Sequence, residues 1–278
     1  MNMDFRLVIC DLDNTLVGHG MGSAMTERTK EMIRCLHRHG VSFGIASGRP
    51  LDELQAYAGI WGLEKEINVF VCLNGSELWD GSTGQVFDYY KLKKEWMKEV
   101  IDLLAPFNLN PYIYYHGAFL CKRDDFGVER SAQRAHKPVI VAKDISDLYQ
   151  EDNAKIMFRV KEGQMEEVER FLEDHPSPHY HGFKTQETLL EVANRKVSKA
   201  YAMERYCEHH GIALSQVLAF GDTSNDNDML IAAGKGVCLA NGSDDTKAIA
   251  DDITERPSGE DGVAIYMEDH YFKSLGWM

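Results

Sequence analysis

Short, nearly uninterrupted apolar runs recur near both ends of the chain, and polar residues follow each of them within one or two positions. Runs of about 4–8 apolar residues bounded by turn residues are typical of strands buried on both faces of a parallel sheet. Stretches with helical spacing separate the runs, so strand and helix alternate as they do in α/β proteins. We expect strands at 6–10, 41–46, 69–73, 217–220 and 236–239, with helices at 26–39, 198–210 and 226–233.

The middle of the chain follows a different pattern, which begins after the turn-rich stretch 80–84, Asp-Gly-Ser-Thr-Gly. An aromatic strand is expected at 111–121, followed by a polar connector to about residue 153. Strands that are adjacent in the sequence suit antiparallel pairing, which is typical of an α+β domain. The sequence therefore predicts an α/β fold with a doubly wound, parallel, Rossmann-like core from residues 1–84 and 191–278, and an inserted α+β domain at 85–190.

Two acidic clusters directly follow predicted strands. Asp11 and Asp13 come after the first strand, and Asp222 and Asp226 come after the strand at 217–220. Binding sites in open parallel sheets collect beyond the carboxyl ends of the strands, so these four carboxylates are expected to meet. Their mutual repulsion requires a nearby cation or proton. Carboxylate oxygens favour Mg²⁺, which in turn favours phosphate substrates.

The composition limits the class of partner. A net charge of −14 argues against nucleic acid or an anionic membrane surface as the main partner. No apolar run approaches the roughly 20 residues that span a bilayer, and the first residues do not resemble a secretory signal. The six cysteines are scattered, without a C-x-x-C pair, which favours reduced core thiols. We therefore expect a cytoplasmic protein that is a monomer or a small homo-oligomer.

Four motifs, in a fixed order along the chain, resemble those of the haloacid dehalogenase superfamily of aspartate-nucleophile phosphatases. The insertion lies between the second and the third motif, which resembles the Cof-type sugar-phosphatase branch with a class IIB cap domain. The run Leu73-Asn74-Gly75 also fits this branch. The motifs are Asp11-Leu12-Asp13-Asn14-Thr15 (D-x-D-x-T), Ser47-Gly48-Arg49, Lys199 at a helix start, and Gly221-Asp222 through Asn225-Asp226.

Two positions depart from the family pattern. Asn14 stands where the family usually has glycine, and asparagine is the other residue that best tolerates a positive φ, so we expect this change to be neutral. Thr223 stands where glycine is frequent, and the sequence offers no reason for it. The stretch 18–22, Gly-His-Gly-Met-Gly, lacks the third glycine of a nucleotide-binding loop and is expected to form a flap beside the first motif.

The resemblance implies catalysis through an aspartyl-phosphate. Asp11 would be the nucleophile, because a carboxylate can attack phosphorus and divide hydrolysis into two easier steps. Asp13 would protonate the leaving oxygen and then take a proton from the water that cleaves the intermediate. Without the other motifs, the same acids would equally suit an ordinary turn.

The resemblance also implies residues that bind phosphate and metal. Ser47 and Gly48 precede a predicted helix, whose first N–H groups can hold phosphate oxygens. Lys199 would neutralise charge on the phosphoryl group, and Asn225 would donate to a phosphate oxygen or hold Lys199. The ordinary alternatives are capping or turn residues and a solvated lysine. The implied metal ligands are Asp11, the backbone carbonyl of Asp13, Asp222 and Asp226. Asp226 would bind the ion directly or through water, or would orient the other ligands; the ordinary alternative is an acid at a helix N-terminus.

These expectations together describe a Mg²⁺-dependent phosphomonoester hydrolase that acts on a small phosphorylated metabolite such as a sugar phosphate. The inserted domain would act as a cap that excludes water and selects the leaving group. One alternative is a sugar phosphomutase of similar architecture, which would isomerise a sugar phosphate instead of releasing phosphate. The other is a regulator that binds a phosphorylated metabolite without turnover, although the intact set of Asp11, Asp13, Lys199 and Asp222 argues against it.

Overall fold

The computed structural model describes residues 5–18 and 24–277, and it divides into two units. One unit combines the chain up to Tyr89 with the chain from Ser198 onward, and the other consists of residues 90–197. The first unit is therefore built from two distant segments of the sequence, and the second is one continuous insertion. The flap expected at 18–22 lies almost wholly outside the described residues.

A sheet of eight strands forms the first unit. Its strands are β1 (Leu7–Asp11), β2 (Ser42–Ala46), β3 (Ile67–Cys72), β4 (Glu77–Asp80), β5 (Gln85–Asp88), β12 (Val217–Gly221), β13 (Lys235–Cys238) and β14 (Asp252–Ile253). They lie in the order β14-β13-β12-β1-β2-β3-β4-β5; β4 pairs antiparallel with β3 and with β5, and the other neighbours pair parallel. The chain leaves β1 toward β2 but later continues from β12 toward β13. Ligands of open α/β sheets bind at such a reversal, beyond the strand ends.

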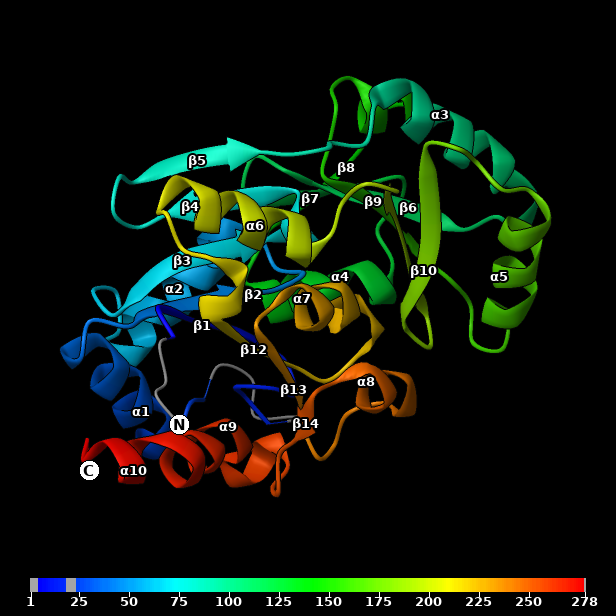
Figure 1. Ribbon diagram of the computed structural model, residues 1–278. Coiled ribbons are helices and arrows are strands. Elements are labelled where there is room, and N and C mark those ends of the chain that lie inside the picture. The colour runs from blue at the N-terminus through cyan, green and yellow to red at the C-terminus, as the bar shows by residue number, and fades with distance from the viewer. Residues whose placement is uncertain (1–4, 19–23, 278) are drawn as a thin grey trace. The chain divides into compact units, whose positions relative to one another are not determined.

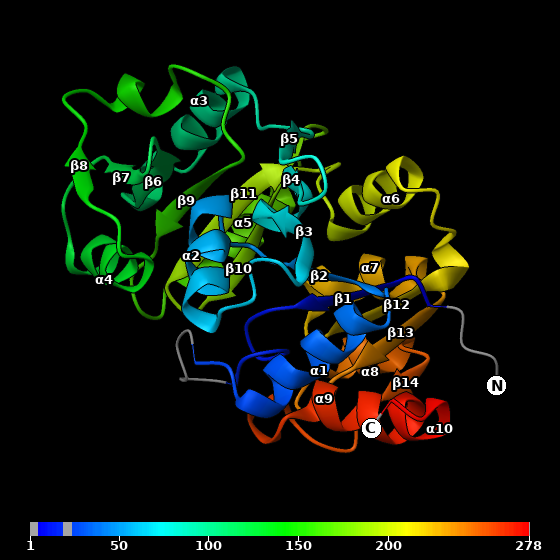
Figure 2. The same cartoon turned by 90° about the vertical axis from the view of Figure 1, so that its left-hand side faces the viewer.

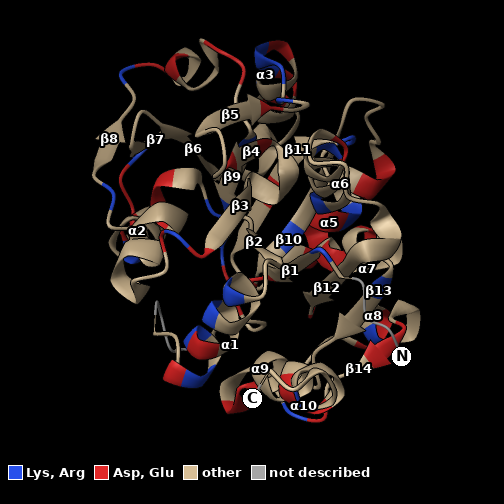
Figure 3. Cartoon of the chain, turned by 60° about the vertical axis from the view of Figure 1, so that its left-hand side comes forward, with Lys and Arg blue, Asp and Glu red and all other residues tan. Residues whose placement is uncertain are grey.

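Helices cover both faces of this sheet (Figures 1 and 2). They are α1 (Glu27–Arg38), α2 (Leu51–Trp61), α6 (Lys199–His209), α7 (Asn227–Ala232), α8 (Asp244–Ile249), α9 (Gly262–Met267) and α10 (Lys273–Leu275). Val8 and Cys10 of β1 pack with residues of α1, α2 and α9, whereas Leu7 and Ile9 pack with residues of α6 and α7. Because alternate residues of a strand face opposite sides, a sheet covered on both faces needs strands that are apolar throughout. Charged residues instead gather on helices such as α1 and α8 (Figure 3).

Local signals in the sequence set several element ends as expected. The Thr26 hydroxyl accepts a hydrogen bond from the Thr29 N–H and caps α1. Pro50 directly precedes α2, where its fixed φ suits the start of a helix. Asn14 adopts a φ of 64°, a left-handed conformation that asparagine tolerates better than most residues other than glycine.

The second unit is a six-stranded sheet with helices on both faces. Its elements are α3 (Lys94–Leu103), β6 (Asn110–Tyr115), β7 (Ala118–Cys121), α4 (Phe126–Ala135), β8 (Val139–Val141), β9 (Lys155–Arg159), α5 (Met165–Asp174), β10 (Tyr180–Gln186) and β11 (Leu189–Asn194). The strand order is β10-β11-β9-β6-β7-β8, and only β7 and β8 pair parallel. Ile113 and Ile156 pack with α3 and α5, whereas Tyr112 and Phe119 pack with α4.

The structure corrects the expected elements of this region in two ways. The aromatic stretch 111–121 is a hairpin of β6 and β7, whose turn contains His116 and Gly117, both with positive φ. The stretch expected to be a polar connector holds α4 and β8. Only Val128 and Ala132 of α4 are buried, so its hydrophobic signal in the sequence is weak.

The units divide a few residues after each border expected for the insertion. The turn-rich stretch 80–84 joins β4 to β5 as a hairpin within the first unit, so it does not separate the units. The other border, after residue 190, falls inside β11 of the second unit. Among the described residues, no helix combines the length and the apolar character needed to cross a membrane.

Candidate active site

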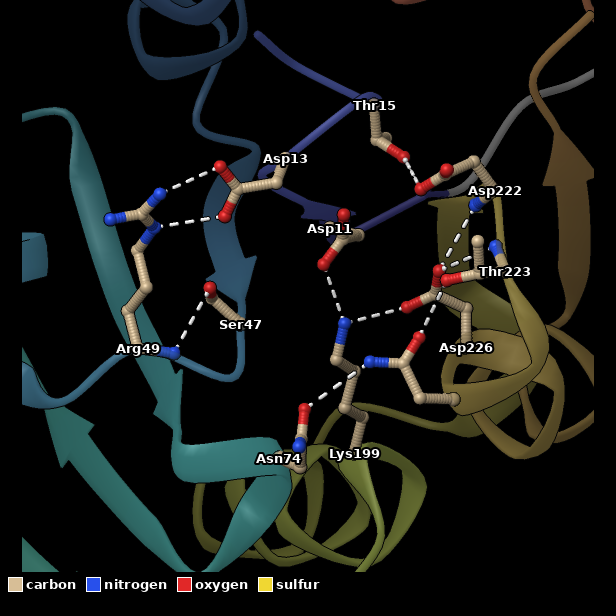
Figure 4. A network of polar contacts seen from close by, with 11 residues as sticks. Asp11, Asp13, Thr15, Ser47, Arg49, Asn74, Lys199, Asp222, Thr223 and Asp226 are labelled. Atoms are coloured by element: carbon tan, nitrogen blue, oxygen red, sulfur yellow. Dashed lines mark hydrogen bonds and ion pairs between the residues drawn. The ribbon is translucent and has the colours of Figure 1, made fainter. Parts of the chain in front are cut away.

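Polar side chains from separate chain segments meet at the carboxyl edge of the first unit's sheet (Figure 4). Asp11 ends β1 and Ser47 directly follows β2. Asp222 directly follows β12, and Lys199 is the first residue of α6. The strands β12, β1 and β2 are parallel neighbours, so their ends meet at one edge of the sheet. Lys199 reaches the same edge from the start of α6, although it lies about 190 positions from Asp11 in the sequence.

Lys199 lies at the centre of this group and is fully buried. Its Nζ donates to Oδ1 of Asp11 at 2.5 Å and to Oδ1 of Asp226 at 2.6 Å (Figure 4). Gly75 adopts a φ of +100°, and a Cβ there would lie 2.0 Å from the Ser198 carbonyl oxygen. The backbone at Gly75 therefore passes directly against the start of α6, which fixes the place of Lys199.

Asp226 organises the loop that follows β12. Its Oδ2 accepts hydrogen bonds from the backbone N–H groups of Asp222, at 3.0 Å, and Thr223, at 3.2 Å. A Cβ on Gly221 would lie 2.5 Å from the Cβ of Asp226, so this tight turn requires glycine. The Thr15 hydroxyl donates to Oδ1 of Asp222 at 3.0 Å and ties the first motif to the fourth.

The electrostatic balance of the group is unfavourable without a further positive charge. Burial raises the pKa of Asp11 well above its ordinary value; Lys199 opposes this shift, and the charges of Asp226 and Asp222 add to it. Burial and the charge of Asp226 raise the pKa of Asp222 to about 6, against the hydrogen bond from Thr15. Burial would lower the pKa of Lys199, but the neighbouring carboxylates Asp11 and Asp226 raise it.

The same residues fit a divalent cation. Asp11, Asp222 and Asp226 are all buried, and each offers a carboxylate oxygen within 4.8 Å of the others. One ammonium group cannot balance three ionised carboxylates, so a further cation or a proton must offset the remaining negative charge in a site that excludes most water. A set of oxygen ligands with excess negative charge suits a hard cation such as Mg²⁺.

Asp13 does not join this group through its side chain. Its carboxylate is half exposed and turns to Arg49, whose Nε and Nη2 each donate to one of its oxygens at 2.8 Å (Figure 4). Of the four acids named from the sequence, the structure therefore brings together the side chains of Asp11, Asp222 and Asp226.

The residues expected to bind phosphate form the border of the group. Ser47 is buried, and its Oγ accepts a hydrogen bond from the Arg49 N–H at 3.2 Å. A Cβ on Gly48 would lie 3.3 Å from Oδ1 of Asn74, so glycine permits this close approach. Asn225 is exposed, and its Nδ2 donates to Oδ1 of Asn74 at 3.3 Å. Lys199, which Asn225 was expected to hold as one alternative, is instead held by Asp11 and Asp226.

Asn74 was not among the site residues named from the sequence, although it contacts this border. Leu73 and Asn74, with φ of 51° and 60°, and Gly75 form a left-handed run directly after β3. Such conformations are uncommon for leucine and often occur at functional sites. The Asn74 N–H donates to the Ser47 carbonyl at 2.9 Å. The sequence did hold one signal for Asn74: it is a polar residue directly after the apolar strand predicted at 69–73.

The comparisons with known proteins agree with this arrangement. A family model described as haloacid dehalogenase-like hydrolase matches residues 8–267. The Bacillus subtilis (strain 168) protein YitU, named 5-amino-6-(5-phospho-D-ribitylamino)uracil phosphatase, is 25% identical over 279 residues, covering 95% of this chain and 97% of its own. YcsE from the same strain carries the same enzyme name and is 26% identical over 268 residues, covering 95% and 94%.

Solved structures share the fold at low sequence identity. A haloacid dehalogenase-like hydrolase from Bacteroides thetaiotaomicron superposes with a TM-score of 0.84 at 23% identity, covering 96% of this chain and all (100%) of its own. The sugar phosphatase BT4131, described as subclass IIB, gives a TM-score of 0.80 at 20% identity, with coverage of 98% and 100%. These structures confirm the predicted α/β fold class.

The family match confirms the resemblance inferred from the four motifs, and the relatives named phosphatases support phosphatase activity. The region matched by the family model spans both units and includes every site residue described above. The predicted enzyme class is therefore confirmed: the chain belongs to the haloacid dehalogenase-like hydrolases.

Proposed function

We propose that the protein is a Mg²⁺-dependent phosphomonoesterase that uses Asp11 as its nucleophile on a small phosphorylated metabolite. The observation that carries this proposal is the buried group in which Lys199 bridges Asp11 and Asp226 beside Asp222. Asp11 lies at a strand end, where Lys199 holds its carboxylate, so it is placed to attack a phosphorus atom. The excess negative charge around it would be offset by a metal ion, which would also offset the charge of the phosphate.

In the first step, Asp11 attacks the phosphorus atom. Lys199 holds Oδ1 of Asp11, so we assign the attack to Oδ2. The new bond joins Asp11 to phosphorus while the bond from phosphorus to the ester oxygen breaks, and that oxygen takes a proton from Asp13. Ser47, Gly48, Lys199 and Asn225 would bind the phosphoryl oxygens, as charge on them changes during transfer.

In the second step, water attacks the phosphorus of the aspartyl-phosphate. Its proton passes to Asp13, the bond to Asp11 breaks, and inorganic phosphate leaves. A Mg²⁺ ion bound by Asp11, Asp222 and the backbone carbonyl of Asp13 would offset charge on the phosphate and among the carboxylates. We assign Asp226 to holding the loop and Lys199 beside this ion.

The substrate that we propose is a phosphate ester of a sugar or a sugar alcohol. YitU and YcsE are named for a substrate with a phosphorylated ribityl chain, and BT4131 is named a sugar phosphatase. Residues 90–197 would act as the cap that selects the leaving group. We place the enzyme in the cytoplasm, since its six cysteines are all free and buried. We propose a monomer or a small homo-oligomer.

Replacing Asp11 with asparagine tests the nucleophile. We expect Asp11→Asn to lower Mg²⁺-dependent phosphate release by at least about 10³-fold, because loss of a nucleophile removes the covalent route. The measurement is phosphate release over a panel of sugar and sugar-alcohol phosphates. Asp102→Asn, which changes an exposed carboxylate of α3, is the matched control and should retain activity.

Two outcomes would overturn the proposed function. Phosphate release that is unchanged in Asp11→Asn would remove Asp11 as the nucleophile. Isomerisation of a sugar phosphate by the wild-type protein, followed by NMR and without net phosphate release, would identify a phosphomutase instead.

A further inference from the structure

The Asp13 carboxylate is held by an arginine that the proposed mechanism does not use. Arg49 Nε donates to Oδ2 of Asp13, and Nη2 donates to Oδ1, both at 2.8 Å (Figure 4). A guanidinium fork that meets a carboxylate in this way fixes both its position and its rotation. The Asp13 side chain is 52% exposed, so without Arg49 it would sample several rotamers in water.

Arg49 is itself anchored on the side away from Asp13. Its Nη1 donates to the Tyr57 hydroxyl at 2.9 Å and to Glu53 at 3.3 Å, both on α2. The guanidinium carbon lies 5.2 Å from the centre of the Tyr57 ring. The Arg49 backbone carbonyl accepts a hydrogen bond from the Leu73 N–H at 3.0 Å. These contacts with α2 and with the segment after β3 hold the Arg49 side chain and backbone in place. Because Arg49 is held, its hydrogen bonds restrict the position of the Asp13 carboxylate.

The charges around Arg49 favour a positioning role over phosphate binding. Its guanidinium contacts two carboxylates, Asp13 and Glu53, so its positive charge is already matched within the first unit. Lys199 donates to the Asp11 carboxylate and already provides a positive group for a phosphate there.

We propose that Arg49 is a positioning residue that holds the Asp13 carboxylate in place for the second step of the proposed reaction. Both oxygens of Asp13 accept hydrogen bonds from Arg49, so the guanidinium fixes the orientation in which this carboxylate meets the attacking water. Asp13 takes the proton from that water while the water oxygen bonds to phosphorus and the bond from phosphorus to Asp11 breaks. The inference rests on the proposed function and assigns Arg49 to the hydrolysis of the aspartyl-phosphate.

Rapid-mixing kinetics with p-nitrophenyl phosphate and Mg²⁺ test this role. Nitrophenolate is a good leaving group that needs little protonation, so the first step should remain fast in Arg49→Gln. We expect steady-state turnover to fall by about 10–100-fold, less than the roughly 10²–10⁴-fold that general acid–base catalysis contributes, because Asp13 itself is retained. A burst of about one nitrophenolate per enzyme should precede it, and acid-quenched protein should carry covalent phosphate by intact mass. A loss that is equal in the first and later turnovers, without phosphoenzyme, would overturn the inference.

A double-mutant cycle separates positioning from direct substrate contact. If Arg49 acts through Asp13, Arg49→Gln should lower turnover by less than about threefold in an Asp13→Asn background, because coupled residues are not additive. Full additivity would instead place Arg49 on the substrate and overturn the proposal. Arg49→Lys, which keeps the charge but not the fork, should show the same burst with a smaller loss.

Further variants keep the result interpretable. Tyr57→Phe removes only the hydroxyl behind Arg49 and should give a small loss in the same second step. Arg38→Gln breaks an exposed pair with Glu31 on α1 and should match wild type throughout. Wild-type protein without phosphatase activity would refute the proposed function, whereas an active wild type with an unaffected Arg49→Gln variant would refute only the role of Arg49.

Discussion

At the scale of single residues, Lys199 determines the electrostatics of the site. It is fully buried and contacts Asp11 and Asp226, which are also buried. A buried ion pair contributes little net stability when intact, but removing one partner leaves an uncompensated charge in a medium of low dielectric. The lysine is therefore required both for the proposed chemistry and for the folded state.

Replacing this lysine tests that balance. Lys199→Met keeps most of the side-chain volume, and we expect it to lower the free energy of unfolding by about 3–5 kcal/mol, the cost of breaking a buried pair. Saturating Mg²⁺ should restore part of the loss, because the cation offsets the same carboxylates. Chemical denaturation with and without Mg²⁺ measures both effects.

Lys235→Met is the matched control. Lys235 pairs with Asp252 at 3.0 Å but remains partly exposed, so its loss should change stability by less than about 1 kcal/mol. Equal destabilisation by the two variants would show that Lys199 is an ordinary packed side chain.

The strand-end pattern predicted that Asp11 and Asp222 would meet, and the family resemblance added Lys199; the structure brings these side chains into one group. Asp11, Asp222 and Lys199 each occupy a strand end or a helix start, and the parallel topology brings such ends together. The pairing of Asp13 with Arg49 could not be predicted, because it depends on side-chain rotamers and on the anchor that Tyr57 provides.

At the scale of elements, glycines set how closely segments approach the site. Gly75 follows β3 and passes against the start of α6, where a Cβ would lie 2.0 Å from the Ser198 carbonyl oxygen. Leu73 and Asn74, directly before Gly75, are left-handed, and the Asn74 N–H donates a hydrogen bond to the Ser47 carbonyl. This turn therefore joins the second and third motifs.

Gly75→Ala should move α6 away from the sheet edge. We expect a loss of at least about 3 kcal/mol of stability, since the positive φ and the clash with backbone both disfavour alanine. Gly84→Ala is the matched control: Gly84 also has a positive φ, of 70°, but nothing lies within 4 Å of its Cβ, so the loss should be about 1–2 kcal/mol. Urea unfolding compares the two, and equal losses would contradict a packing role for Gly75.

At the scale of the whole molecule, the apolar cores separate along the unit border. Of the buried clusters among the described residues, two lie entirely in the first unit and two lie entirely within residues 90–197. The strands of each sheet likewise come from one unit only. Each unit therefore contains the contacts that an independently folding domain needs.

Residues 90–197 expressed alone should fold cooperatively. We expect a sigmoidal thermal transition by circular dichroism, because its six-stranded sheet and both of its cores are complete. The fragment 1–89 is the control and should remain unfolded, since β1 then lacks its neighbour β12 and the helices α6 and α7. A non-cooperative transition for 90–197 would show that the insertion depends on the rest of the chain.

The sequence by itself determined the alternation of strand and helix, the inserted second region and the acidic corner, because apolar periodicity and short motifs are local properties. Only the tertiary structure decided the borders of the insertion, the helix α4 with its two buried residues and the partner of Asp13. Those features depend on contacts between distant segments: β5 pairs with β4 in the core sheet, and Arg49 reaches Asp13 from across the strand ends. Such contacts leave no periodic trace in the sequence.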